Sequence, residues 1–358
     1  MLEHTLACLR RGSFRVAYFG GSITEGAGAS DAGRTSWRAL TTRWFRERFP
    51  EAEVAEIQAA IGGTGSDLGI YRCDRDVIEK QPDLVFIEFA VNDWMGYDAV
   101  LCQIETLIRK LWRANPLIDL VFTFTATAST AGVLAAGGEY ASRSADLTAA
   151  HRYGIPSVDF GEALRTNVLL AGGDWRRYTT DTVHPNDEGY RICADCLAVW
   201  LEKTLASAEG QPEAPHTLPE PLCAVRYENA GMKDAVSFDY DSREGFAPVE
   251  ESLCGRYPRY LEGTAPGASL TFTIRGTCGG VYWMLAKDGG DLLVSVDGGE
   301  ERHYRAWDTY CLDFNRAAHV LFFRDLPEGE HRITLRVADT KEERSTGHAV
   351  RIAAILTA

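Results

Sequence analysis

The chain has 358 residues, of which 45% are hydrophobic and 25% charged, so it is long enough for about two domains and too apolar to be mainly disordered. Its formal net charge of −14 makes nucleic acid and anionic membranes poor partners. No stretch approaches the roughly 18–20 consecutive apolar residues of a membrane-spanning helix, and residues 1–11 show no signal-peptide pattern.

Nine cysteines are scattered between Cys8 and Cys311 without the regular framework of a disulfide-rich protein. This usage is typical of a reducing compartment, so we expect a cytoplasmic protein. Cys193 and Cys196 have the spacing of a redox or metal motif, but they lie in a stretch of helical period, Tyr190–Leu205, with no second ligand pair nearby. We therefore expect them to pack along a helix face, and we expect no metal and no organic cofactor.

The first part of the chain alternates short apolar stretches with longer segments of helical period. Helical period is clearest in Trp37–Phe49 and Val100–Ala114. Stretches that are apolar on both faces, such as Leu84–Ile87, suit buried parallel strands joined by helical crossovers. The pattern therefore predicts an α/β domain over residues 1–205, a doubly wound parallel sheet with its functional residues at the carboxyl ends of the strands. The predicted strands are Phe14–Phe19, Val54–Gln58, Leu84–Phe89, Leu120–Thr125 and Pro156–Val158.

Residues 206–222 are the predicted linker, because they hold four of the thirteen prolines and almost no large apolar side chains. Few contacts of the first domain should depend on them, so a chain ending near Leu205 is expected to keep a complete core. Over residues 223–358 apolar residues alternate, as at Leu270, Phe272 and Ile274, which is typical of strands with one buried face. Since no long helical pattern interrupts this alternation, the second domain is predicted to be an antiparallel β-sandwich.

Ser22 stands where the first predicted strand ends and a helix is expected to begin. Residues 20–24 read Gly-Gly-Ser-Ile-Thr, and a serine in such a tight turn exposes its hydroxyl beside backbone N–H groups that can stabilise a negative oxygen. A turn with a capping serine, or a phosphate-binding loop, would explain the same residues. The glycine spacing fits neither common nucleotide-binding loop, and the Gly-x-Ser-x-Gly elbow is absent because Thr24 replaces its second glycine.

Asp181 and His184 form the second candidate group. A carboxylate three residues before a histidine can lie within one turn of chain, where it accepts the imidazole Nδ1–H and leaves Nε2 facing a nucleophile. Two members of a catalytic triad would then come from four consecutive residues. The alternative is a capping aspartate next to an incidental surface histidine.

Two loops that follow other predicted strands contain candidate hydrogen-bond donors. Residues 60–66 include Gly62 and Gly63, where the lack of a side chain lets a backbone N–H approach a substrate closely. Asn92, after the third predicted strand, offers a side-chain N–H. Both loops can converge on Ser22 and form a three-donor oxyanion hole with its N–H. Ordinary glycine and Asn-Asp turns would explain the same sequences.

These four blocks, in this order, resemble the SGNH (GDSL-like) hydrolase superfamily, whose name lists the Ser, Gly, Asn and His supplied by successive loops. The resemblance implies a flavodoxin-like α/β fold and two-step acyl transfer without a cofactor. By position, Ser22 would be the nucleophile, His184 the general base and Asp181 the residue that orients it. Ser22, Gly63 and Asn92 would form the oxyanion hole.

The resemblance covers about residues 13–203 and has two departures. Gly21 stands where the family has an aspartate before the serine, and Ala90 replaces the glycine of Gly-x-Asn-Asp. Neither removes a chemical group from the mechanism. The doubled glycine leaves Gly62 open as an alternative to Gly63.

The run Leu326–Val337 resembles a strand–turn–strand element of carbohydrate-binding β-sandwiches. SGNH enzymes joined to such sandwiches often deacetylate polysaccharides, so the resemblance implies an esterase acting on short-chain, O-acetyl esters of oligo- or polysaccharides. A lysophospholipase or thioesterase of the same superfamily, and a non-catalytic glycan-binding protein, are the alternatives.

Three tryptophans are further candidates for substrate contacts. Trp94 is expected to shape the substrate pocket, the alternative being that it simply packs in the fold. Trp283 and Trp307 either stack on sugar rings or belong to a core.

Overall fold

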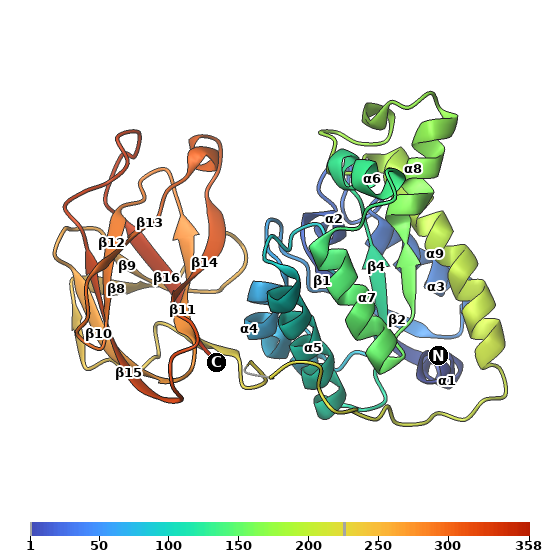
Figure 1. Ribbon diagram of the computed structural model, residues 1–358, viewed down its shortest axis with the longest axis horizontal. Helices are drawn as coiled ribbons and strands as arrows, with labels where there is room; N and C mark the ends of the chain where they lie inside the picture. The colour runs from blue at the N-terminus through green and yellow to red at the C-terminus, as the bar shows by residue number, and fades with distance from the viewer. Residues whose placement is uncertain (1, 225–226) are drawn as a thin grey trace. The chain divides into compact units, whose positions relative to one another are not determined.

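The computed structural model describes residues 2–224 and 227–358 (Figure 1). These residues form two compact units, one ending at Glu228 and the other spanning Asn229–Ala358. The first unit therefore extends well past residue 205, where the sequence predicted its end. Within the described parts of the chain, no helix is both long and apolar enough to cross a membrane.

The strands of the first unit form one parallel sheet in the order β2-β1-β3-β4-β5. β1 lies between β2 and β3, so the loops at the carboxyl ends of these three strands are neighbours. β3 and β4 are buried along their whole length, as expected for strands covered by helices on both faces. The predicted doubly wound α/β fold is confirmed, and each strand ends within one residue of its predicted bounds. The strands are β1 (Ser13–Gly20), β2 (Glu53–Gln58), β3 (Leu84–Glu88), β4 (Asp119–Phe124) and β5 (Ser157–Asp159).

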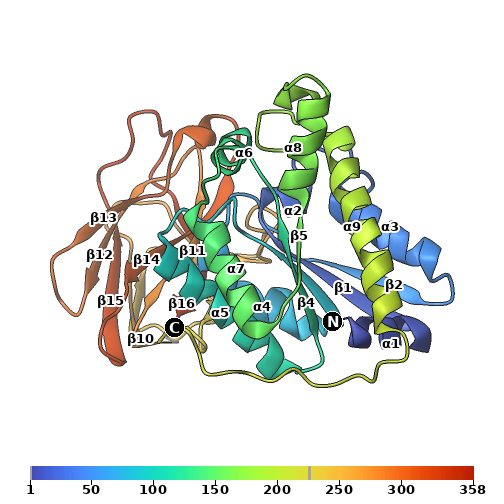
Figure 2. The ribbon, with the colours of Figure 1, turned by 45° about the vertical axis from the view of Figure 1, so that its right-hand side comes forward.

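Helices cover both faces of this sheet (Figure 2). On one face α9 packs against α1, α3 and α8, and on the other face α5 packs against α4 and α7. Cys193 is buried in α9, in keeping with the predicted helix face, and no disulfide links any of the nine cysteines, all of which are described. The helices are α1 (Glu3–Arg11), α2 (Ser22–Glu25), α3 (Trp37–Arg48), α4 (Ser66–Asp76), α5 (Tyr97–Ala114), α6 (Ala128–Ala135), α7 (Ala141–Tyr153), α8 (Phe160–Leu170) and α9 (Asp187–Ala208).

The segment predicted as a linker stays on the first unit after α9 ends (Figure 2). We call residues 209–223 the strap. Near its start, Glu213 accepts a hydrogen bond from Arg11 and pairs with His4 Nδ1 at 2.5 Å. Further along, the His216 ring stacks on Trp112, with ring centroids 4.5 Å apart. The strap thus joins α1 to α5 along one edge of the unit.

The end of the strap is held by charged side chains of α5. The N–H groups of Leu222 and Cys223 donate to the Glu105 carboxylate at 2.7 and 2.8 Å, and Arg109 donates to the Pro219 carbonyl at 2.9 Å. Glu105 is completely buried. A proline-rich segment forms no regular structure, but its backbone groups still need partners, and here the side chains of α5 provide them. This explains why the first unit includes the predicted linker.

His4 lies at the centre of the contact between α1 and the strap. Burial alone would lower the pKa of His4, but hydrogen bonds to Asp83, Cys8 and Glu213 raise it to about 10. Cys8 Sγ is 3.9 and 3.5 Å from the two ring nitrogens, so the sulfur lies beside the ring and not in line with a nitrogen lone pair. The arrangement is that of a protonated histidine paired with two carboxylates, Asp83 and Glu213.

The second unit consists of two antiparallel sheets packed face to face, which confirms the predicted β-sandwich. Their strand orders are β13-β12-β15-β10-β7 and β14-β11-β16-β9-β8, with β6 also paired to β16. The residues that alternate in the sequence, Leu270, Phe272 and Ile274, face the core between the sheets. The strands are β6 (Gly231–Asp234), β7 (Ser242–Glu244), β8 (Phe246–Val249), β9 (Tyr260–Gly263), β10 (Ser269–Gly276), β11 (Gly279–Leu285), β12 (Asp291–Val296), β13 (Arg302–Arg305), β14 (Arg316–Phe323), β15 (Gly329–Val337) and β16 (Val350–Thr357).

Trp283 and Trp307 belong to this core. Their side chains are buried, with exposed fractions of 3% and 5%, among the apolar residues between the two sheets. The core alternative is therefore the correct one, and neither ring is available to stack on a sugar. The exposed aromatic residues of this unit are Tyr310 and Phe314, next to each other at the end of the short helix Thr309–Leu312.

Candidate active site

Ser22 lies at the tight turn between β1 and α2. A Cβ atom added at Gly20 would lie 2.5 Å from the Glu88 carbonyl oxygen, and one added at Gly21 would overlap Asn92 Oδ1. Both glycines are therefore needed for close packing against β3 and the loop that follows it. The departure from the family pattern at Gly21 has a local reason, because no side chain fits between this turn and Asn92.

The structure brings together Ser22, His184 and Asp181, as the sequence predicted. Ser22 Oγ lies 2.8 Å from His184 Nε2, and His184 Nδ1 lies 2.7 Å from Asp181 Oδ2. With Nδ1–H donating to the carboxylate, Nε2 is left as the acceptor for the serine hydroxyl proton. The three side chains form a continuous relay of hydrogen bonds ending at the serine oxygen.

The carboxylate of Asp181 is fixed by its own turn. Asp181 Oδ1 accepts hydrogen bonds from the N–H groups of Val183 and His184 at 3.0 and 2.8 Å. Thr182 has φ of 70°, which allows the chain to turn back tightly enough for these bonds. Partial burial favours the protonated acid, but the hydrogen bonds from His184 and Val183 hold the pKa of Asp181 below its ordinary value. The side chain is thus a carboxylate at neutral pH, with Oδ2 directed to the imidazole.

The two glycines that the sequence left open differ in the structure. Gly62 N–H donates to Glu25 Oε2 at 2.7 Å, so this donor is already engaged. Gly63 is exposed, has φ of 70°, and its N–H takes part in no backbone hydrogen bond among the described residues. This difference favours Gly63 over Gly62 as the predicted oxyanion donor.

Asn92 faces the Ser22 turn from the loop after β3. Its N–H donates to the Phe89 carbonyl at 2.8 Å, and its Oδ1 lies against Gly21. Trp94 follows two residues later and is 91% exposed. The packing alternative for Trp94 is therefore wrong, while its predicted role in shaping the pocket stays a prediction.

Glu88 is a completely buried carboxyl group directly behind the Ser22 turn. Its two oxygens accept hydrogen bonds from Thr24 and Thr125, both at 2.8 Å. Burial raises the pKa of Glu88 to about 7, against the effect of these hydrogen bonds. An unfolded glutamate loses its proton near pH 4.5, so the native state binds more protons between pH 4.5 and 7. Stability from this group therefore falls as pH rises through that window.

We expect Glu88→Gln to remove this pH dependence, because the amide keeps both threonine contacts and has no proton to lose. Relative to the variant, the wild-type free energy of unfolding should fall between pH 5 and 8 by up to roughly 3 kcal/mol, the equivalent of the pKa shift. Urea unfolding at both pH values measures the difference. Parallel pH profiles for the two proteins would show that Glu88 does not titrate in this range.

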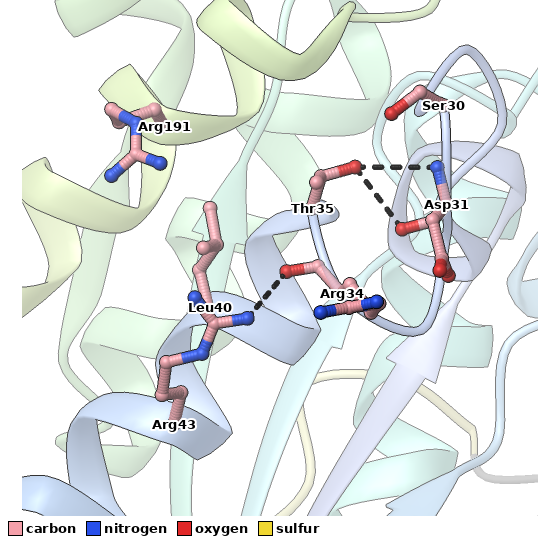
Figure 3. Close-up of a pocket in the computed structure, with 7 residues that line it drawn as sticks. All are labelled: Ser30, Asp31, Arg34, Thr35, Leu40, Arg43 and Arg191. Atoms are coloured by element: carbon pink, nitrogen blue, oxygen red, sulfur yellow. Dashed lines mark hydrogen bonds between the residues drawn. The ribbon is translucent and has the colours of Figure 1, made fainter.

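A hollow of about 350 Å³ opens near the start of α3 and the first turns of α9 (Figure 3). None of the predicted site residues lines it. Ser30 and Thr35 in its wall donate to Asp187 at 2.5 and 2.7 Å, three residues after His184. These bonds fasten the loop after α2 to the start of α9, so they hold the serine and histidine blocks together. The lining residues are Ser30, Asp31, Arg34, Thr35, Leu40, Arg43 and Arg191.

Residues 18–192 match the GDSL-like lipase/acylhydrolase family, and this range contains every predicted site residue. The first domain belongs to this family. The matched range includes all or part of every strand of the parallel sheet; Ser22 follows β1, whereas Asp181 and His184 lie in the segment between α8 and α9. No curated protein matches the sequence significantly.

Two solved structures resemble the whole chain. One is a two-domain esterase active on acetylated mannans, with a TM-score of 0.86, 21% identity, and coverage of 100% of this chain and 95% of that one. The other is such an esterase co-crystallized with mannopentaose, with a TM-score of 0.85, 21% identity, and coverage of 99% and 94%. At this identity the likeness concerns the fold, a GDSL-like domain followed by a β-sandwich.

Two residues were missed from the sequence, Glu25 and Glu88, which accept hydrogen bonds from Gly62 and from Thr24 beside the Ser22 turn. Glu88 had a signal, because a glutamate that ends an otherwise apolar buried strand needs partners. Glu25 had none, since a glutamate in a short polar turn is ordinary. The exposed pair Tyr310 and Phe314 was also missed, because aromatic residues in a β domain are more often core.

Proposed function

We propose that the protein is a serine esterase that removes short acyl groups, acetyl above all, from carbohydrate hydroxyls. The observation that carries the proposal is the hydrogen-bonded relay from Ser22 Oγ through His184 to Asp181. This is the arrangement that turns a serine hydroxyl into a nucleophile toward a carbonyl carbon.

In the proposed first step, Ser22 Oγ attacks the ester carbonyl while His184 Nε2 accepts its proton. Asp181 stabilises the imidazolium and keeps its orientation. The negative oxygen of the tetrahedral intermediate would accept hydrogen bonds from Gly63 N–H, Asn92 Nδ2 and the Ser22 N–H. His184 then gives its proton to the departing sugar oxygen.

In the second step, water attacks the acyl-serine while His184 again accepts a proton. The same donors stabilise the second tetrahedral intermediate, and acetate leaves as Ser22 recovers its proton from His184. All steps use groups of the GDSL-like domain alone.

We infer acetylated mannan as the first polysaccharide to test. The support is the full-length resemblance to the mannan esterases, which is of fold and not of close sequence. Trp94 offers an exposed ring two residues from Asn92, and aromatic rings of this kind commonly stack on sugars. The acidic chain, with a net charge of −14, suits a neutral polymer better than a polyanionic one.

The test compares p-nitrophenyl acetate with the butyrate and octanoate esters, and acetylated glucomannan with acetylated xylan, by release of nitrophenol or acetate. We expect activity confined to short acyl chains, and faster acetate release from glucomannan. Preference for octanoate would favour the lysophospholipase or thioesterase alternative. No hydrolysis of any ester, together with binding of glycan, would favour the non-catalytic one.

Asn92→Ala is expected to lower kcat by roughly 10²–10³-fold with little change in KM, the usual cost of losing one oxyanion donor. The side chain would donate only to the transition state, so ground-state binding should be unaffected. Steady-state kinetics on p-nitrophenyl acetate separate the two constants. A loss confined to KM would make Asn92 a binding residue instead.

A further inference from the structure

The loop that carries Gly63 is tied at both ends to carboxylates. We call residues 62–66 the glycine loop. At its start Gly62 N–H donates to Glu25 Oε2 at 2.7 Å, and at its end Ser66 N–H donates to Asp93 Oδ1 at 2.7 Å. The proposed oxyanion donor therefore lies between two backbone N–H groups whose hydrogen-bond acceptors lie outside the loop.

The loop needs such support because its own composition does not fix it. Gly62, Gly63 and Gly65 are three of its five residues, and glycine has the largest backbone freedom of any residue. Thr64 contributes one internal contact, from its hydroxyl to the Ile61 carbonyl at 2.8 Å. An oxyanion hole accelerates a reaction only when its donors are already oriented before charge develops.

Each carboxylate also connects the loop to another part of the proposed oxyanion hole. Glu25 lies on α2, three residues after Ser22, and Asp93 directly follows Asn92. The loop passes close to the nucleophile, since a Cβ added at Gly62 would lie 3.5 Å from Ser22 Cβ and 2.8 Å from Glu25 Oε2. Each hydrogen bond thus joins the glycine loop to a residue that is close in the chain to another proposed donor: Glu25 to Ser22, and Asp93 to Asn92.

We propose that Glu25 and Asp93 are positioning residues, which fix the Gly63 N–H relative to Ser22 and Asn92. The inference rests on the proposed esterase function. Asp93 is the last residue of the Gly-x-Asn-Asp pattern, to which no role was assigned from the sequence, and Glu25 belongs to none of the four blocks. Neither carboxylate reacts with substrate. Both accept a backbone N–H and so determine where the next donor in the chain points.

Substitutions of Glu25 and Asp93 differ in how far a loss of activity can be told apart from a loss of stability. Asp93 accepts the N–H of Ser66, the first residue of α4, so its loss would also weaken the start of that helix. Glu25 accepts the N–H of Gly62, which lies outside any helix or strand, and its side chain is only half-buried. Glu25 is therefore the residue for the decisive test.

The experiment compares Glu25→Ala and Glu25→Gln with wild type on p-nitrophenyl acetate, with Tm measured alongside. Glu202→Ala is the matched control, because Glu202 is an exposed helical glutamate whose contact is to Arg48. We expect Glu25→Ala to lower kcat by about 10–100-fold with KM within twofold, less than the loss of a whole oxyanion donor. Glu25→Gln should recover activity to within about threefold of wild type, because its amide oxygen accepts the same N–H.

Asp93→Asn provides a second measurement that does not depend on Glu25. Its amide oxygen can accept the Ser66 N–H, so kcat should stay within about threefold. Asp93→Ala should lower kcat more than its effect on Tm explains, relative to Glu202→Ala. Both results would support a hydrogen bond as the basis of positioning.

The inference is overturned if Glu25→Ala keeps kcat within twofold, if its loss lies in KM, or if Glu25→Gln is as impaired as the alanine variant. The last result would assign the effect to the charge and not to the hydrogen bond. Failure of the esterase proposal would look different, because wild type itself would then hydrolyse none of the esters.

Discussion

Ser22→Ala is expected to lower kcat on p-nitrophenyl acetate by roughly 10⁴–10⁶-fold, the cost of removing a triad nucleophile. The covalent route disappears with the hydroxyl, and only the oxyanion donors and substrate binding remain to favour direct attack by water. The fold should be unchanged, because the hydrogen bond of Ser22 Oγ goes to His184 Nε2, a proposed catalytic contact, and alanine fits the turn. Steady-state kinetics, together with Tm and circular dichroism, give both quantities.

His184→Ala is the matched control for this result. If the two residues act as a unit, each single variant and the double variant should lose nearly the same activity, because the effects of triad members are far from additive. A Ser22→Ala protein within tenfold of wild type would contradict the assignment of the nucleophile.

Truncation of the chain after Leu205 is expected to prevent stable folding, whereas truncation after Glu228 should leave an intact GDSL-like domain. The shorter chain lacks the strap, and so Glu105, Arg109 and His4 lose their partners in it. Hydrogen bonds to charged groups contribute about 1.5–3 kcal/mol each, so the loss is on the order of 5 kcal/mol. That is comparable with the whole stability of many domains.

Urea unfolding of the two truncated chains measures this difference. The chain ending at Glu228 should unfold cooperatively, and the chain ending at Leu205 should have a much lower midpoint or no transition. Equal midpoints would mean that the strap only rests on the domain, as expected from its composition alone.

The parts of the structure that the sequence predicted are those with a strong local signal. The strands near Leu84–Glu88 were recognisable because parallel strands covered on both faces are apolar throughout. Asp181 and His184 were recognisable because their spacing alone lets the carboxylate reach Nδ1. In the structure, hydrogen bonds from Ser30 and Thr35 to the start of α9 then hold the histidine segment beside the serine turn.

The parts that were not predicted depend on contacts between distant residues. The proline-rich composition of residues 206–222 indicates the absence of helix and strand, but it does not show where the backbone groups find partners. The available signal was on α5, where the charged residues Glu105 and Arg109 lie among buried apolar positions. Buried charges of this kind require partners from elsewhere in the chain.

The choice between core and surface for the tryptophans depended on the same kind of information. Trp283 follows Tyr282 in β11, a strand buried along its whole length. The sequence there does not alternate between apolar and polar residues, so it did not show whether Trp283 faces the core. Trp94 lies in a loop, where no periodicity exists. Whether each tryptophan is buried or exposed therefore depends on tertiary packing, which the sequence pattern does not show.

The contact between His4 and Glu213 has a consequence for the order of events during synthesis. These residues are 209 positions apart, so α1 leaves the ribosome long before the strap that holds it has been made. Other contacts of α1 are with parts of the chain made earlier: Asp119 accepts the N–H and hydroxyl of Thr5, both at 2.8 Å, and His4 pairs with Asp83 at 3.4 Å. The leucines of α1 are also buried in the core of the first unit. The nascent first domain can therefore dock α1 through these contacts, but His4 gains the carboxylate of Glu213 only when the strap emerges, just before the second domain begins to be made.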